Sequence, residues 1–464
     1  MERLTRAQLE QLTKDELVAL VERLCEQLDG LQSDVVRLRS DVDELKRPPA
    51  TSHNSSLPPS RDQKSNAPPR GRAKRRGGRP GHVRMERAWV AEPTRVIIAH
   101  PAQCVCGADL STVKPQKVTR RQLTELPIIQ PVVFETHQHD VCCPQCGQLQ
   151  RGVLPVGLEA ERAFGPRLEA AVTYLLHQQH LGYERTQTTL QELLGVDVSA
   201  GGQVAIMQRA GAAAAAAAEP IRAELCRSAV VGSDETGARL NGQTWWEWVF
   251  CAEQVVYHVI RPSRGYDVIA EVMGQARAQV WVCDCWAPQL QAPATQHQLC
   301  LAHQIRNLQG LRERCPRLAW ARELQALLRE AIHLAKRRAE LTLRGFARRV
   351  AELERRLQCL IDRPVQTPAA QALLKRYRKH RAHLFVFLRD PTVPHHNNAC
   401  ERSLRTSVVH RKVIGTFRTE WGAHAYAALA SVLDTAKVRG QSVFGSLLAL
   451  MGPPVLPYLN TSNP

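Results

Sequence analysis

Two apolar runs that each end in an aspartate constrain the fold of this chain most. Residues 229–234 read AVVGSD and residues 280–284 read VWVCD. A short apolar run is typical of a buried strand, and a carboxylate that ends such a strand lies where the chain leaves the core. If the two strands are neighbours, Asp234 and Asp284 lie at one edge of a sheet. For either residue alone, a simple capping aspartate is the alternative.

The sequence around these runs predicts a β-rich unit of strands and one helix. A turn is expected after Asp234, and the elements follow from apolar and β-branched segments bounded by turn residues. Strands are expected over 227–234, 244–251, 255–261 and 279–284, and a helix over 266–273.

Positive charge is concentrated in two segments. Lys and Arg number 62 against 44 Asp and Glu, a net charge of +18; residues 61–84 carry +8 of it and residues 311–381 carry +12. Such basic surfaces favour a polyanionic partner, nucleic acid before acidic membrane. Solvated helix faces and a basic tail are the alternative.

Membrane insertion and secretion are not expected for this chain. No apolar run approaches the roughly 18 residues of a membrane span, and the opening MERLTRAQLEQL is too charged for a secretory signal. We therefore expect a cytoplasmic, nucleoid-associated protein. In that compartment the 14 cysteines are thiols or metal ligands rather than disulfides.

Residues 1–46 carry an unbroken heptad pattern. From Leu17 to Leu45, Leu or Val recurs at spacings of four and three residues. Leu at every d position and Val or Leu at every a position favour a parallel two-stranded coiled coil, which predicts a homodimer or a higher oligomer. One amphipathic helix packed on its own domain is the alternative.

Residues 47–85 form a basic linker that is rich in Pro, Ser, Gly and Arg and cannot bury enough apolar surface to fold alone. We interpret it as an extended arm that binds DNA phosphates. The residues expected to make these contacts are Arg72, Lys74, Arg75, Arg76 and Arg79.

Two cysteine knuckles lie in residues 86–158. Cys104-x-Cys106-Gly and Cys143-Pro-Gln-Cys146-Gly flank β-like runs such as 128–134. Four thiolates in two knuckles are typical of a structural zinc site, so we expect a zinc-ribbon-like module that binds Zn²⁺. The first knuckle is one residue short, and Cys142, His137 and His139 are substitute ligands. Buried free cysteines are the alternative.

Residues 159–225 are expected to be helical. The string LQELLGVDVSAGGQVAIM predicts a helix, a Gly-containing turn, a Ser N-cap and a second helix. A DNA-binding helix-turn-helix and a plain helical hairpin fit this pattern equally well.

A third carboxylate is needed for a metal site with Asp234 and Asp284. Glu401 in HHNNACERSLR is the candidate, on a helix that Asn397 or Asn398 caps. Oxygen ligands suit Mg²⁺ or Mn²⁺, and two such ions about 3.5–4 Å apart promote phosphoryl transfer. The residues on this helix that we expect to contact DNA phosphates are Arg402, Arg405, Arg411 and Lys412.

These motifs together resemble the large transposase of the insertion sequence 66 family over nearly the whole chain. The resemblance is carried by SSLPPSRD and GGRPGH, RRQLTELP, GSDETGARLNG, VCDCWAPQ, LCLAHQIRNL and NNACERSLR…RKVIGTFRTEWGAHAYAALASVLDTAKVRG. It departs from the family at the shortened first knuckle and at Trp286, where a Tyr is more usual.

The resemblance implies a DDE transposase with an RNase H-like catalytic domain, here residues 226–440, and an acidic triad of Asp234, Asp284 and Glu401. It also implies a helical insertion at about 310–390, a C-terminal tail at 441–464, and the use of small accessory proteins. Cys300-x-x-His303 matches a CxxH position in the family. In this chain a second metal site and packing in the core are the two alternatives for the pair, and we expect packing. The fold class is therefore multi-domain α+β.

The implied reaction is Mg²⁺-dependent cleavage at the ends of an insertion sequence, followed by attack of the freed 3′-hydroxyl on target DNA. Phosphoryl transfer of this kind depends on positioning and charge neutralisation and needs no covalent nucleophile. One rival is a non-catalytic dimeric DNA-binding regulator or an inactive relic, which needs no carboxylates. The other is a plain RNase H-like nuclease, which cleaves without joining strands.

Overall fold

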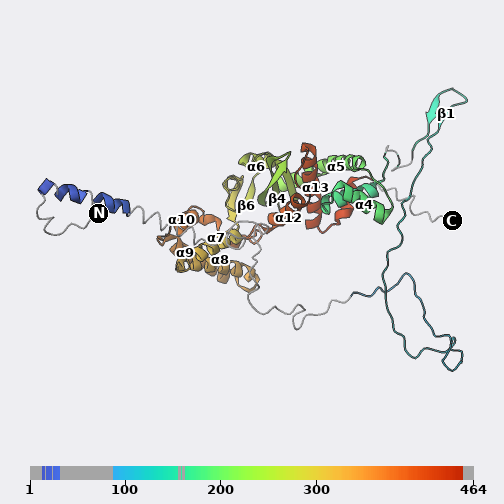
Figure 1. Ribbon diagram of the computed structural model, residues 1–464, viewed down its shortest axis with the longest axis horizontal. Coiled ribbons are helices and arrows are strands. Elements are labelled where there is room, and N and C mark those ends of the chain that lie inside the picture. Colours follow the sequence, from blue (N-terminus) through green and yellow to red (C-terminus); the bar gives the residue numbers. More distant parts are fainter. Residues whose placement is uncertain are drawn as a thin grey trace.

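The computed structural model describes residues 13–15, 17–22, 25–31, 87–154, 158 and 162–452 (Figure 1). Within them the chain is a mixed α/β protein with one large mixed sheet and many helices. The strands are β1 (Asp140–Cys142), β2 (Leu149–Arg151), β3 (Val230–Leu240), β4 (Gln243–Cys251), β5 (Val256–Arg261), β6 (Ala278–Cys283) and β7 (Ala294–Leu299).

Helices precede, cover and follow the sheet (Figure 1). They are α3 (Pro166–Thr173), α4 (Tyr183–Leu194), α5 (Ala200–Arg227), α6 (Tyr266–Met273), α7 (Leu301–Arg314), α8 (Ala319–Lys336), α9 (Leu343–Asp362), α10 (Pro368–Lys379), α11 (Val386–Arg389), α12 (Asn398–Val413), α13 (Glu420–Val438) and α14 (Val443–Leu450).

The large sheet has the strand order β5-β4-β3-β6-β7. β4 is antiparallel to both β3 and β5, whereas β6 is parallel to both β3 and β7. The chain thus forms a three-stranded antiparallel meander and then adds two parallel strands on the other side of β3. The helix expected over 266–273 is α6, which lies in the crossover from β5 to β6.

Strand β3 is longer than the sequence analysis predicted. The expected turn after Asp234 is wrong, because β3 pairs with β4 as far as Leu240↔Gln243. Asn241 and Gly242 form the turn with φ of +47° and +79°. Positive φ at both positions is the type I′ hairpin conformation that Asn-Gly favours. Asp234 therefore lies within its strand rather than at its end.

The fifth strand, β7, was not predicted. Its sequence, ATQHQL, is mostly polar, so it lacks the apolar run that marked the other strands. It pairs in parallel with β6 from Ala278↔Ala294 to Cys283↔Leu299, and its last residues are buried. The strand is held by backbone pairing and by burial of its C-terminal half.

One hydrophobic core joins the sheet to the helices that follow it. Trp248, Phe250 and Trp281 are fully buried on the sheet, and the same cluster continues into Leu324 on α8 and Leu357 on α9. The helices α7 to α11 between β7 and α12 therefore share the core of the sheet instead of enclosing a separate one.

The edge strand β5 is covered by α13. Ser431 Oγ accepts a hydrogen bond from the His258 backbone N–H at 2.8 Å, and Thr435 Oγ1 bonds both the N–H and the carbonyl of Val256 at 3.0 Å. The unpaired backbone groups of an open strand edge can pair with another chain. Here the two hydroxyl groups form hydrogen bonds with backbone groups of β5 within the fold.

The helix pair before the sheet has the predicted local signals. Gly195 ends α4 with φ of +65°, and Ser199 caps α5 by accepting a hydrogen bond from the Gly202 N–H at 3.2 Å. α5 continues to Arg227 and packs closely on α13, where a Cβ on Gly211 would lie 2.5 Å from the Ala425 Cβ. α5 thus connects the helices that precede the sheet with α13, the helix that covers β5.

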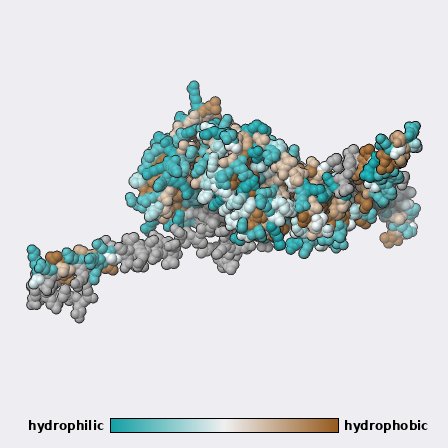
Figure 2. All heavy atoms as spheres, turned by 90° about the horizontal axis from the view of Figure 1, so that it is seen from above, coloured by the Kyte–Doolittle hydropathy of each residue, from teal (hydrophilic) through white to brown (hydrophobic). Residues whose placement is uncertain are grey.

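The described part of the N-terminal heptad segment is helical, and Figure 2 shows hydrophobic side chains along it. Leu17, Val21, Leu28 and Leu31 are all exposed. The rest of the predicted coil from Leu24 onward includes residues outside the described ranges. Within those ranges, no helix combines the length and apolar content of a membrane span.

Candidate active site

The sheet register brings Asp234 and Asp284 level with each other. The parallel pairing of β3 with β6 ends at Gly232↔Val282, and two residues further along each chain are Asp234 and Asp284. Asp284 directly follows β6, whereas Asp234 remains paired with Val249 on β4. The two carboxylates thus lie at the edge where β3 extends beyond β6, as the sequence predicted on the assumption of neighbouring strands.

Asp234 experiences a strongly negative environment. Burial raises its pKa well above the usual range, and the carboxylates of Glu235, Asp284 and Glu401 raise the pKa further. The backbone N–H of Glu235, which donates to Asp234 Oδ1 at 3.0 Å, opposes this effect. A carboxyl group crowded by like charges in a low-dielectric site is stabilised in its ionised form by a cation.

Among the described residues neither Asp234 nor Asp284 has an ion-pair partner. The one hydrogen bond to the Asp284 carboxylate within those ranges comes from the Trp286 backbone N–H at 2.8 Å. By contrast, the adjacent Glu235 has two partners: Arg264 Nη2 lies 2.8 Å from its Oε1, and Gln289 Nε2 lies 2.6 Å from its Oε2. The carboxyl groups at this sheet edge that lack an ion-pair partner among the described residues are therefore those of the two predicted aspartates.

Glu401 reaches this edge because α12 packs directly on β3. Asn397 precedes the helix and donates from Nδ2 to the Ser233 carbonyl at 2.7 Å. A Cβ on Gly232 would lie 2.8 Å from Asn397 Oδ1 and 3.3 Å from Cys400 Sγ. Only glycine at 232 allows this approach, which places Glu401 in the first turn of α12 beside the aspartates.

The predicted capping role of the asparagines is wrong in its chemistry. Asn397 occupies the N-cap position, but its side chain makes no capping hydrogen bond. The amide bonds the neighbouring strand instead. The backbone N–H of Asn397 donates to Cys300 Sγ at 3.3 Å, and the Leu301 N–H donates to the His395 carbonyl at 2.8 Å. The start of α12 is therefore fixed to both β3 and the start of α7.

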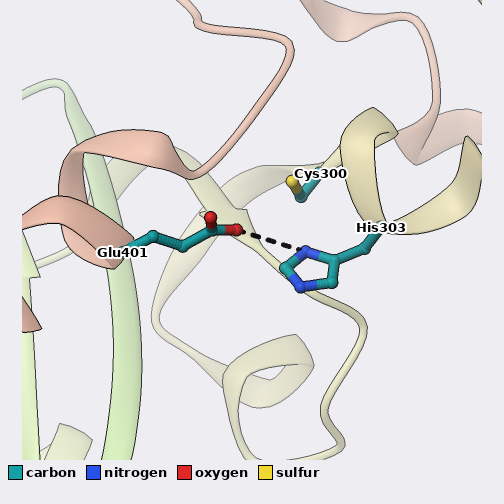
Figure 3. Close-up of side chains that lie close together, drawn as sticks. All are labelled: Cys300, His303 and Glu401. Carbon is teal, nitrogen blue, oxygen red and sulfur yellow. Dashed lines mark ion pairs between the residues drawn. The ribbon is translucent and has the colours of Figure 1, made fainter. Parts of the chain in front are cut away.

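Glu401 faces His303 of α7 (Figure 3) and also lies near Arg306 of the same helix. Its Oε1 lies 3.8 Å from His303 Nδ1 and 3.4 Å from Arg306 Nη2. Ligand atoms of Cys300, His303 and Glu401 all lie within 4.8 Å of one another, and this is the one such group among the described residues. The ligand atoms of Asp234, Asp284 and Glu401 therefore do not all lie within 4.8 Å of one another.

Burial controls the protonation of the two α7 residues. It raises the pKa of the Cys300 thiol to about 11, and it lowers the pKa of His303 with help from the nearby charge of Arg306. Asp284 and Glu401 act in the opposite direction on His303. Both side chains are consequently neutral near pH 7 in the absence of a ligand.

An arginine that stacks on two tryptophan rings next to the aspartates was not predicted from the sequence. The Arg264 guanidinium lies between two indole rings, 4.5 Å from the centroid of Trp246 and 4.2 Å from that of Trp286. It also pairs with Glu235, the residue after Asp234. Trp286 is partly exposed. Glu235 lies in the DETG motif and Trp286 in the CDCWAP motif, each close in sequence to a predicted aspartate, and this closeness was the signal that the sequence offered. Arg264 lies outside both motifs, and no sequence signal indicated its role.

The cysteine knuckles form two similar turns. Gly107 and Gly147 have positive φ, and each donates its N–H to the carbonyl of the first cysteine in its knuckle at 2.9 Å. Cys104 and Cys143 are half-buried, whereas Cys106 and Cys146 are exposed, so the alternative of buried free cysteines is wrong. The four sulfurs do not gather within 4.8 Å of one another. The β-like run at 128–134 is not a strand.

The predicted DNA-contacting residues of α12 differ in their surroundings. Arg402, Arg405 and Lys412 are exposed. Arg411 is half-buried, and its guanidinium donates to the Gly237 carbonyl on β3. It therefore has a structural contact in addition to any external one. The predicted phosphate-binding residues of the basic arm, Arg72 to Arg79, lie outside the described residues.

Fold and site together define an α/β protein with a group of carboxyl side chains at one sheet edge and exposed basic residues on α12, the helix that carries Glu401. A family model described as Transposase IS66 family matches residues 161–425, more than half of the chain. The chain belongs to this family, which supports the role of a transposase, an enzyme that acts on DNA. A comparison with curated proteins finds no match.

Proposed function

We propose that the protein is a DDE transposase that cleaves DNA at the ends of an insertion sequence and transfers the freed strand into target DNA. The observation that carries the proposal is the convergence of Asp234, Asp284 and Glu401 on one sheet edge. The effects of the last two on the pKa of Asp234 express that proximity. The strand order β5-β4-β3-β6-β7 supports the RNase H-like fold that the resemblance implies.

The donor set fits Mg²⁺ or Mn²⁺. Hard cations prefer carboxylate oxygens, and the two aspartates lack an ion-pair partner among the described residues. In this proposal Asp234, Asp284 and Glu401 hold the ions. Bound there, the ions would activate the attacking oxygen and stabilise the leaving oxygen at phosphorus.

The protein side chains contribute position and charge. β3 fixes Asp234 through its pairing with β4, and the contact of Asn397 with Ser233 fixes the helix of Glu401. Arg402 and Arg405 flank that carboxylate on the exposed side of α12 and would contact DNA phosphates. Lys412 lies two turns further along the same helix and extends this basic face.

The helices between β7 and α12 add a second basic surface. Of their acidic side chains, Glu323, Glu330, Glu340, Glu352 and Glu354 are already paired with arginines of the same region. Because basic residues outnumber acidic ones by 12 in 311–381, a surplus remains to bind the DNA backbone.

Three further parts of the proposal concern assembly. The knuckles of Cys104, Cys106, Cys143 and Cys146 would bind Zn²⁺ once their two turns come together. The heptad segment would form a homodimer or a higher oligomer, which suits a reaction on two DNA ends. Small accessory transposition proteins remain an expectation of the family resemblance.

A strand-cleavage and strand-joining assay tests the proposed function. With Mg²⁺ and a DNA substrate that carries the element ends, Asp234→Asn and Glu401→Gln should each reduce cleavage at least about 100-fold, since each removes a charged ligand of the cations that stabilise the transition state. Glu253→Gln, an exposed change in the β4–β5 turn, is the control and should retain activity. Undiminished activity in both site variants would contradict the assignment.

The same assay separates the rival functions. A non-catalytic DNA-binding regulator or relic would bind the element ends without cleaving them, even in the unaltered protein. A plain nuclease would cleave without producing joined strands. The proposed transposase gives both cleaved and joined products, and both depend on the same three carboxylates.

A further inference from the structure

A second candidate metal site lies beside the proposed catalytic one. Cys300 precedes α7, His303 lies in its first turn, and Glu401 approaches from α12 (Figure 3). Their sulfur, nitrogen and oxygen ligand atoms are all within 4.8 Å of one another. Cys300 is fully buried, His303 is 9% exposed, and the Glu401 side chain is 29% exposed, so two of the three ligands are buried and the third opens the group to solvent.

His303 has an unused ligand atom in this group. Its Nδ1 is buried and has no hydrogen-bond partner among the described residues. Figure 3 shows that this nitrogen faces the Glu401 carboxylate, and the separation of 3.8 Å exceeds a hydrogen bond. A buried polar nitrogen without a partner costs free energy. Coordination of a cation would satisfy it.

The identities of the three ligands select the class of cation. A thiolate, an imidazole and a carboxylate suit a zinc-class ion, whereas Mg²⁺ prefers oxygen ligands alone. At zinc bond lengths, tetrahedral ligand atoms lie roughly 3.3–3.6 Å apart. Small side-chain rotations would bring the present group to that spacing. Three protein ligands would leave a fourth position for water.

We propose that Cys300, His303 and Glu401 bind a zinc-class divalent cation, and that this ion holds Glu401 away from Asp234 and Asp284. Binding displaces the thiol proton of Cys300 to solvent. Arg306 is the cation that competes for the same Glu401 oxygen. The inhibitory consequence rests on the proposed function, because it requires Glu401 to act with the two aspartates. The binding site itself does not depend on that function.

Cobalt binding tests the site without reference to activity. Co²⁺ takes the place of Zn²⁺, and a thiolate ligand gives it a charge-transfer absorption. Full-length protein should bind one more equivalent of Co²⁺ than either Cys300→Ser or His303→Gln, and the thiolate absorption per protein should fall accordingly in Cys300→Ser. Cys315→Ser, at the other end of α7, is the matched control and should bind as the unaltered protein does. Equal stoichiometry in all four proteins would overturn the site.

Zinc inhibition tests the consequence. In the presence of Mg²⁺, the Zn²⁺ concentration that halves DNA cleavage should rise at least tenfold in Cys300→Ser, with each protein compared with its own rate without zinc. Equal sensitivity in Cys300→Ser and Cys315→Ser would refute the competition for Glu401. If the unaltered protein cleaves no DNA, the proposed function and the inhibition fail together, and the cobalt stoichiometry alone decides whether the site exists.

Discussion

Gly232 and the start of α12 pack closely together in the site. The absent side chain at this position gives Asn397 room to reach the Ser233 carbonyl and brings Glu401 to the aspartates. Neither Gly232 nor Asn397 carries charge. The position of the third carboxylate nevertheless depends on both of them.

A methyl group at this position should separate helix from strand. In Gly232→Ala the new Cβ would lie 2.8 Å from Asn397 Oδ1. We therefore expect the free energy of unfolding to fall by about 1–3 kcal/mol. The rate of DNA cleavage should fall by a larger fraction than the free energy of unfolding does. Gly237→Ala on the same strand is the control, since its Cβ would meet no atom closer than 3.6 Å. Urea denaturation and cleavage rates check both. Equal effects of the two substitutions would contradict the packing account.

For single residues, the sequence indicated the charged side chains of the site but not the contacts that position them. Asp234 and Asp284 could be predicted because each ends an apolar run, a local signal. The bond from Asn397 to Ser233 spans 164 residues, and nothing near Asn397 in the chain indicates it. The expected N-cap was a reasonable local interpretation that a distant backbone carbonyl displaced.

Helix α13 and strand β5 are held together by a buried ionic network. His258 on β5 contacts Glu247 Oε1 on β4 at 3.0 Å through Nδ1 and Asp434 Oδ2 on α13 at 3.2 Å through Nε2. Ser407 of α12 donates to the same Glu247 oxygen at 2.6 Å. Burial alone would lower the pKa of His258, but the bonds to Asp434 and Glu247 raise that pKa to about 10.

This network should make stability depend on pH above neutrality. The pKa of His258 is about 10 in the fold and about 6.5 in the unfolded chain. Its contribution is therefore complete below pH 6.5 and is lost as the pH rises towards 10, with a slope approaching about 1.4 kcal/mol per pH unit. Urea denaturation at pH 7 and pH 9 measures this slope.

Substitution of the imidazole should flatten the pH profile. His258→Gln is expected to be less stable at pH 7 and to lose little more by pH 9, because its side chain does not titrate. His333→Gln, on the exposed side of α8, is the control and should follow the unaltered protein. A profile for His258→Gln as steep as that of the unaltered protein would show that another group is responsible.

The elements were predictable where local patterns were strong. The helix over 266–273 and the strands near 244–251 and 255–261 match α6, β4 and β5 closely. The end of β3 was misplaced, although Asn241-Gly242 is a strong hairpin signal. β7 was missed because its polar sequence becomes a strand only through its pairing with β6.

At the scale of the whole molecule, the helical segment near the N-terminus exposes the apolar side chains that the heptad register places on one face. Exposed leucines and valines in such a row are stabilised by a second helix. We expect Val21→Lys combined with Leu28→Lys, both at a positions, to convert a dimer into a monomer. Sedimentation equilibrium measures the change.

A control substitution keeps this prediction specific to the apolar face. Glu26→Lys, at an f position of the same register, changes charge by more than either lysine above and should leave the dimer intact. A monomeric unaltered protein, or an equal loss of association with Glu26→Lys, would contradict the coiled-coil assignment.

The central claim is that three carboxylates, distant in sequence, surround one group of cations. Fe²⁺ in place of Mg²⁺, with ascorbate and peroxide, generates radicals that cut the nearby polypeptide backbone. The proposal predicts cuts close to residues 234, 284 and 401, suppressed by excess Mg²⁺ and lost in Asp234→Asn. Cuts near 300 and 401 with none near 234 or 284 would contradict it.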